Sequence, residues 1–103
     1  MESVLSYLEF VSKVSDAQKS FLLLYQKGSE QSTCAFKNVE KAAVETDRAR
    51  FFSADVNIVK DIHGLYGVES VPSLLVFDEG KLANIIKGCH DSNYYKDLTQ
   101  SNL

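Results

Sequence analysis

The first apolar pattern along the chain runs from Met1 to Val14. Its large aliphatic residues recur at steps of three and four, which is the spacing of one face of an α-helix. The sequence therefore predicts an opening helix whose buried face carries Val4, Leu5, Leu8, Val11 and Val14. Residues 15–19 are mostly polar and predict a break after it.

A short apolar run without interruption, Phe21–Tyr25, comes next. Such a run is typical of a central strand that is buried on both faces. After a polar loop, a second helical pattern begins at Cys34 and continues to Val44. Ser32 or Thr33 would cap this helix, which puts Cys34 in its first turn. Its predicted inner face carries Ala35, Phe36, Val39 and Ala43.

The second half of the chain alternates strand and helix patterns. In Arg50–Val56, every second residue is apolar and predicts a strand. Asn57 could cap a third helix, in which Ile58, Ile62 and Leu65 would share a face. An apolar run then begins at Pro72, turns at Asp78-Glu79-Gly80 and returns through Leu82–Lys87. Asp91 or Ser92 could cap a last helix carrying Tyr94, Tyr95 and Leu98. The predicted order is α-β-α-β-α-β-β-α, an α/β protein.

The composition predicts one domain over residues 1–103, long enough to bury a core without cross-links. A net charge of −3 offers no electrostatic footprint for nucleic acid or an anionic membrane. No apolar run approaches the roughly 20 residues that a membrane span requires. The N-terminus shows neither a basic segment nor a small-residue cleavage site, so we expect no signal peptide and a cytoplasmic location. Two cysteines at this spacing fit no zinc site, and we expect no metal and no cofactor.

Pro72 is the only proline of the chain and opens the third apolar run. Proline lacks an N–H and fixes φ, so it fits the first residue of a strand but not its middle. Its position suits an ordinary trans proline that begins an edge strand, and it also suits a cis peptide bond at a tight strand entry.

Four short motifs in this half of the chain resemble the thioredoxin family. They are Asp55-Val56-Asn57, Tyr66-Gly67-Val68, Val71-Pro72-Ser73 and the Phe77-x-x-Gly80 hairpin, in the family's order and near its spacing. The resemblance covers about two thirds of the chain. It implies a three-layer α/β/α sandwich with a four-stranded mixed sheet, because the strand that precedes the first helix in thioredoxins has no room here. It also implies that Pro72 resembles the family's cis-proline, whose loop faces the redox site and pairs with substrate backbone.

The family's Cys-x-x-Cys motif is absent. At its place, at the start of the second helix, the overlay puts Gln31-Ser32-Thr33-Cys34, so that Cys34 matches the resolving cysteine and Gln31 the attacking one. A longer insertion would instead put Cys34 on the first position, as in a monothiol site. The tryptophan before the motif is missing too, and Leu24 stands where the family has a carboxylate in the preceding strand.

Cys34 can be interpreted in two ways. In a first helical turn, unpaired N–H groups and the helix dipole would lower its pKa from the reference value of about 8.5 and make it reactive. Alternatively, Cys34 is buried beside Phe36, with a raised pKa and no chemical role.

The second cysteine, Cys89, follows a Lys87-Gly88 strand end that resembles the family's glycine beside the redox site. The resemblance would bring Cys89 near Cys34, and we hypothesise that the two replace the missing local dithiol, with His90 stabilising a Cys89 thiolate. The alternative is two unconnected free thiols.

Two functions follow from this resemblance. In the first, the protein is a noncanonical thiol–disulfide oxidoreductase or redox sensor that uses Cys34, alone or together with Cys89, on a protein partner. In the second, it is a redox-inactive module that docks a peptide segment in a groove of Thr33, Val71, Pro72 and Gly88. The sequence leaves the substrate and the oligomeric state open.

Overall fold

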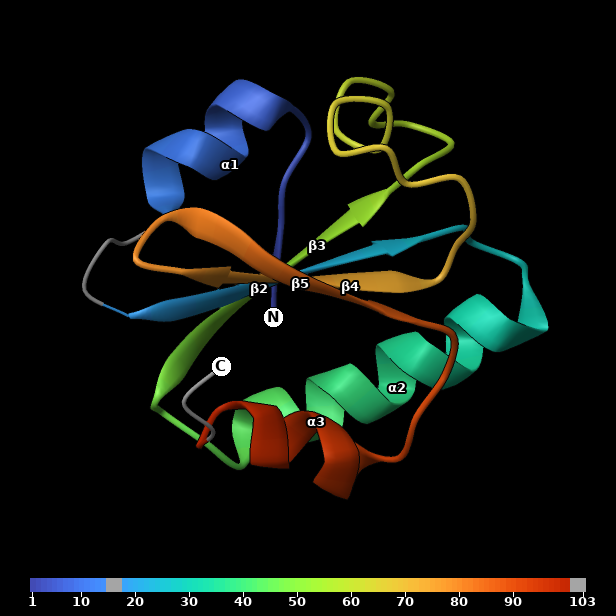
Figure 1. The fold of residues 1–103 in the computed structure, drawn as a ribbon. Helices are drawn as coiled ribbons and strands as arrows, with labels where there is room; N and C mark the ends of the chain where they lie inside the picture. The colour runs from blue at the N-terminus through green and yellow to red at the C-terminus, as the bar shows by residue number, and fades with distance from the viewer. Residues whose placement is uncertain (15–17, 101–103) are drawn as a thin grey trace.

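A five-stranded mixed sheet forms the middle layer of the described part of the chain (Figure 1). The computed structural model describes residues 1–14 and 18–100. The strands lie in the order β1-β3-β2-β4-β5, with β1, β3 and β2 parallel and β4 and β5 antiparallel to their neighbours. Their bounds are Glu2–Ser3 for β1, Lys19–Tyr25 for β2, Ala49–Asp55 for β3, Ser73–Asp78 for β4 and Lys81–Lys87 for β5.

Helices and turns cover both faces of this sheet (Figure 1). Helix α1, Tyr7–Lys13, lies on one face together with the turns that join β3 to β4. Helices α2, Glu30–Val44, and α3, Ser92–Leu98, lie on the other face. The predicted α/β class and three-layer arrangement are confirmed.

The central position of β2 follows from its uninterrupted apolar sequence. Successive side chains of a strand point to opposite faces, so a strand covered on both sides needs apolar residues at every position. Leu22 and Leu24 pack in the core below α1, whereas Phe21 and Leu23 pack in the core against α2 and α3. The prediction of a central strand at Phe21–Tyr25 is confirmed.

The prediction of four strands is wrong, because the N-terminal residues form β1. Glu2 and Ser3 pair in parallel with Phe52 and Ser53 of β3, and the Val4 N–H donates to the Ser53 carbonyl at 2.9 Å. A two-residue strand is too short to show an alternating pattern, so no local signal predicts it.

The first helix is shorter than predicted, and it buries a different face. Ser6 caps it by accepting a hydrogen bond from the Glu9 N–H, and the helix begins only at Tyr7. Phe10 is its buried residue, whereas Leu8 is 78% exposed. The polar break predicted at residues 15–19 lies partly in residues 15–17, outside the described part of the chain.

The third helix that the sequence predicts is absent from the described structure, where residues 56–72 form turns. Asp55, rather than Asn57, closes the first turn, because its carbonyl accepts from the Ile58 and Val59 N–H groups. Val59 and Ile62 are buried, whereas Ile58 and Leu65 are exposed. Two glycines within this short segment, each unfavourable in a helix by about 1 kcal/mol, favour turns.

The β4–β5 hairpin forms where the sequence predicts it. Glu79 and Gly80 both have positive φ, at 53° and 79°, as the two-residue turns of hairpins require. The two strands leave this turn antiparallel and return the chain to Lys87. This return places the end of β5 beside the beginning of β4. None of the helices in the described residues is long and apolar enough to cross a membrane.

Candidate functional site

Cys34 lies on the second turn of α2 rather than the first. Ser29 caps the helix, because its hydroxyl accepts from the Ser32 N–H at 3.3 Å and its carbonyl accepts from the Thr33 N–H. Glu30 in the first turn adds a favourable interaction with the helix dipole. The predicted caps, Ser32 and Thr33, are therefore wrong, and the helix begins four residues before Cys34. Unpaired N–H groups at a helix start do not stabilise a thiolate at this position.

Cys34 and Cys89 form a disulfide that joins α2 to the segment after β5. Their Cα atoms lie 5.9 Å apart, within the ordinary range for such bonds, although 55 residues separate them in sequence. Cys34 is exposed and Cys89 is half-buried. Cys34 is therefore not buried as one alternative predicted, and the alternative of two unconnected thiols is wrong.

Backbone pairing at the end of the sheet connects Cys89 to Pro72. The Gly88 N–H donates to the Pro72 carbonyl at 2.9 Å, and Cys89 is the next residue. The Val71–Pro72 peptide bond is cis, and Pro72 directly precedes β4. Because β4 lies between β2 and β5, the edge-strand interpretation of Pro72 is wrong. The disulfide and the proline share one end of the sheet.

Tyr95 of α3 holds the backbone on both sides of Cys89. Its hydroxyl donates to the Gly88 carbonyl at 3.2 Å and accepts from the His90 N–H at 3.0 Å. The ring of Tyr95 is completely buried, and burial is the main reason why its pKa is raised. The turn that carries Cys89 is therefore held from both sides by a buried side chain.

Asn38 is the site residue that the sequence interpretation missed. Its Nδ2 atom lies 3.6 Å from Cys89 Sγ, 3.8 Å from Cys34 Sγ and 2.8 Å from the His90 carbonyl oxygen. Residues four apart lie on the same face of a helix, so its spacing from Cys34 was the signal that could have found it.

His90 contacts the site through its backbone, whereas its ring lies elsewhere. The ring stacks on Tyr94 with centroids 4.2 Å apart, and its Nε2 lies 2.9 Å from the Lys87 carbonyl oxygen. A carbonyl only accepts, so Nε2 carries the proton in this arrangement. Nothing in these contacts brings the ring to a sulfur.

Comparison with known proteins identifies solved structures that have a similar fold. No protein-family model matches the sequence, and no curated protein matches it. A mutant thioredoxin from Halobacterium salinarum superposes with a TM-score of 0.87 at 26% identity, over 96% of this chain and 87% of that one. Thioredoxin from Plasmodium falciparum gives 0.86 at 17% identity over all of both chains. Thioredoxin from Fasciola hepatica gives 0.84 at 14% identity, over 97% of this chain and 98% of the other.

The chain has a thioredoxin fold. The start of α2 carries Ser29 as its cap and Ser32 three residues later, which is the spacing of a Cys-x-x-Cys motif without its cysteines. The Ser32 hydroxyl is buried and accepts from the Gln26 N–H at 3.0 Å, and two hydroxyls cannot form a disulfide. Cys34 is the only cysteine of α2; it lies two residues after Ser32 and is bonded to Cys89.

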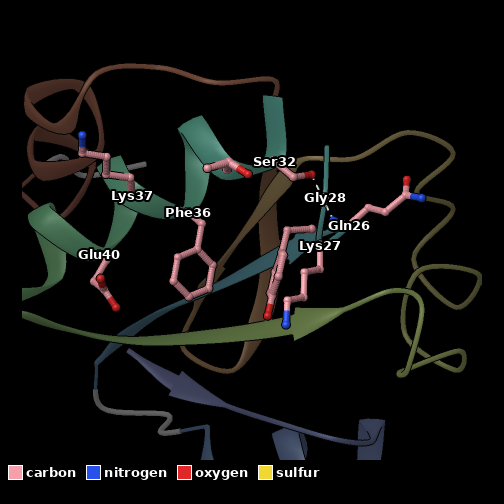
Figure 2. Close-up of a pocket in the computed structure, with 9 residues that line it drawn as sticks. Gln26, Lys27, Gly28, Ser32, Phe36, Lys37 and Glu40 are labelled. Carbon is pink, nitrogen blue, oxygen red and sulfur yellow. Dashed lines mark hydrogen bonds between the residues drawn. The ribbon is translucent and has the colours of Figure 1, made fainter. Parts of the chain in front are cut away.

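A surface groove lies on another side of α2, and no cysteine lines it (Figure 2). Its volume is about 390 Å³. Figure 2 shows Phe36 pointing from the helix into this region and the hydrogen bond between Gln26 and Ser32 at its end. Burial, and then Asp55, raise the pKa of Tyr25 in its wall.

The remaining residues predicted for the site are dispersed. Thr33 lines the groove of Figure 2, and its hydroxyl donates to the Ser29 carbonyl. Val71 lines a separate cavity with His63. Gln31 is exposed on the first turn of α2. Among the residues described, no three His, Cys, Asp or Glu side chains are grouped to hold a metal.

Proposed function

We propose that this thioredoxin-like protein is a thiol–disulfide oxidoreductase whose redox couple is Cys34 and Cys89. One observation carries the proposal: an exposed cysteine and a half-buried cysteine from distant segments are bonded to each other at the proline end of the sheet. That arrangement supplies an accessible sulfur for a partner and a protected sulfur that can close the ring.

In the reduced protein, the Cys34 thiolate attacks one sulfur of a partner disulfide. The partner's S–S bond breaks, its other sulfur leaves as a thiolate, and a mixed disulfide joins the partner to Cys34. The Cys89 thiolate then attacks Cys34 Sγ and releases the partner's second thiolate. The partner gains two electrons and, at neutral pH, two protons, while the protein becomes the disulfide form. A dithiol reductant reverses these steps.

The partner would be a protein segment that lies along the end of the sheet. We place its backbone pairing at Val71, Pro72 and Gly88, and Thr33, Gln31 and His90 are candidates for contacts with more distant parts of the segment. We place this exchange in the cytoplasm, where a thiol reductant would return the couple to its dithiol form.

The second candidate is a redox-inactive binding module in which the disulfide is structural. Its supporting observation is the separation of 55 residues between the two cysteines. On the chain-entropy estimate, closing a loop of this length stabilises the folded protein by about 4 kcal/mol. A module of this kind would dock a segment at the same proline edge without exchanging electrons.

The reduction potential separates the two candidates. The protein would be equilibrated in dithiothreitol buffers of graded potential, quenched with acid and alkylated, and the thiol content read by mass spectrometry. A value near those of thioredoxin and the glutaredoxins, about −200 to −270 mV, supports exchange. A value below about −300 mV marks a structural disulfide and contradicts the proposal.

Trapping tests the order of attack. A Cys89→Ser variant leaves Cys34 with no resolving partner, so it should accumulate mixed disulfides with a protein disulfide substrate. The Cys34→Ser variant is the matched control and should accumulate far fewer, because its remaining cysteine is half-buried. Equal trapping by both variants would contradict the assignment of Cys34 as the attacking thiol.

A further inference from the structure

The carboxamide of Asn38 lies against both sulfurs of the disulfide. Asn38 follows Cys34 by about one helical turn, and its side chain is half-buried. Its Nδ2 atom is slightly nearer to Cys89 Sγ, at 3.6 Å, than to Cys34 Sγ, at 3.8 Å. The carboxamide is thus the polar side-chain group that contacts both reacting atoms.

The hydrogen bond to His90 fixes the orientation of this carboxamide. Nδ2 lies 2.8 Å from the His90 carbonyl oxygen, which can only accept, so the nitrogen and not the oxygen of Asn38 faces this side. One of the two N–H groups is used in this bond. The second remains for the sulfurs and does not depend on the disulfide for its orientation.

A disulfide sulfur is a weak acceptor, but a thiolate carries a full negative charge. A hydrogen bond to a charged group is stronger than one between neutral groups. The contact with Asn38 therefore strengthens as one sulfur becomes a thiolate, and the sulfur that is nearer and less solvated gains most. Exposure makes Cys34 the sulfur that an incoming thiol can reach, and the carboxamide makes Cys89 the sulfur that can leave.

We propose that Asn38 directs thiol–disulfide exchange by stabilising Cys89 as the departing thiolate. This inference rests on the proposed redox function. In the step concerned, a reductant thiolate attacks Cys34 Sγ and forms a mixed disulfide with it. The Cys34–Cys89 bond breaks, and its electron pair remains on Cys89 Sγ, which the second N–H of Asn38 faces. A second reductant thiolate then attacks the reductant sulfur of the mixed disulfide and releases the Cys34 thiolate.

The experiment determines which cysteine carries the first adduct. The oxidised full chain would be mixed with reduced glutathione, quenched with acid during the first turnover, alkylated and digested with trypsin. Cleavage after Lys27 and Lys37 and after Lys87 and Lys96 puts each cysteine in its own peptide. We expect glutathione on Cys34 and the alkyl group on Cys89, in at least about tenfold excess over the reverse pattern. This ratio corresponds to a difference of about 1.4 kcal/mol between the activation free energies of attack at the two sulfurs.

Two substitutions test the role of Asn38. Asn38→Ala removes both donors, and a rise of one unit in the pKa of the leaving thiol should slow adduct formation roughly threefold, if the leaving group is about as sensitive as the attacking one. Asn38→Asp keeps the shape but turns a carboxylate toward the sulfurs, so it should slow the reaction further. Asn93→Ala, at an exposed position of α3, is the matched control and should leave the rate unchanged.

The inference is overturned if adducts form equally on the two cysteines of the native chain. It is also overturned if both Asn38 variants fold and react at the native rate with the native pattern. Failure of the proposed function would look different, since a structural disulfide would stay oxidised at equilibrium in redox buffers poised near the potential of thioredoxin, and its first adduct with glutathione would still form on a defined cysteine.

Discussion

The backbone N–H of Gly88 donates a hydrogen bond of 2.9 Å to the carbonyl oxygen of Pro72. This bond extends the pairing of β4 and β5 by one step beyond the strands, to the residue before Cys89. Gly88 has a φ of 82°, which turns the chain out of the sheet toward α2. The position of Cys89 therefore depends on a backbone conformation that other residues rarely adopt.

Replacing Gly88 with alanine should destabilise the fold by about 1–2 kcal/mol, the difference between left-handed and right-handed conformations for an L-residue. A Cβ at this position meets no atom within 4 Å, so the effect is conformational and not a clash. Urea unfolding of the oxidised protein measures it. Gly64→Ala is the control, because the space there is also open and its φ is not positive. Equal effects of the two substitutions would contradict the explanation.

Replacing Tyr95 with phenylalanine should loosen the turn that holds Cys89. The Gly88 carbonyl and the His90 N–H lose their shared partner, so the two thiols meet less often and the reduction potential becomes less negative. A tenfold loss in effective concentration corresponds to about 30 mV. Equilibration in redox buffers measures the shift. Tyr94→Phe, at the neighbouring exposed tyrosine, should leave the potential within error of the native value.

The oxidised protein should be more stable than a variant that lacks the disulfide. In the chain-entropy model, the double substitution Cys34→Ser with Cys89→Ser lowers the free energy of unfolding by about 4 kcal/mol. Urea unfolding of the oxidised, reduced and doubly substituted proteins measures this. The reduced native chain should resemble the double variant, and a reduced protein as stable as the oxidised one would contradict the estimate.

The elements that the sequence predicted well are those with a strong local signal. Phe21–Tyr25 is apolar at every position, which is typical of a strand covered on both faces. Asp91 caps α3 as predicted, with its carboxylate accepting from the Tyr94 N–H at 2.8 Å. These features depend on neighbours in sequence, which periodicity and capping rules describe.

The first helix shows where such rules fail. Its aliphatic residues recur at helical spacing, yet Leu5, Leu8 and Val11 are exposed and Phe10 is buried. Phe10 packs against Phe52 and Phe77, with ring centroids 5.4 and 5.0 Å away. Aromatic rings of β3 and β4 select the buried side of α1, and a pattern within residues 1–14 cannot show that selection.

Phe10→Ala should therefore destabilise the protein by about 3–5 kcal/mol, because a large side chain that is 1% exposed leaves a cavity. Leu8→Ala on the opposite side of the helix should change stability by less than about 0.5 kcal/mol. Thermal or urea unfolding compares the two. A larger effect at Leu8 would mean that the opening helix packs as the sequence pattern suggests.

Alkaline titration should reveal Tyr66. Burial, followed by the neighbouring phenol of Tyr7, raises its pKa from 10.0 to about 12. Since the pKa is raised in the folded state, the stability linked to it is present below about pH 10 and is lost as the pH rises through 12. The tyrosinate absorbance of the native protein minus that of Tyr66→Phe measures the transition. Tyr7→Phe should lower its midpoint, and an unchanged midpoint would exclude Tyr7 as a cause.

The site was predictable only in part. The thioredoxin resemblance suggested the pairing of Cys34 with Cys89, which no local pattern could give across 55 residues. The register of α2 was missed because Ser29, Ser32 and Thr33 are all plausible caps, and tertiary contacts decide among them. Asn38 was missed because its role depends on the backbone of His90, which reaches it from the far end of the chain.

The cross-link between Cys34 and Cys89 divides the chain into segments that respond differently to a pulling force. When the ends of the oxidised protein are pulled apart, the residues enclosed by the bond cannot extend. Because the bond joins residues 55 positions apart, it prevents about 190 Å of contour length from extending, at roughly 3.5 Å per residue. Optical tweezers would thus read the redox state of a single molecule as the length that it releases on unfolding.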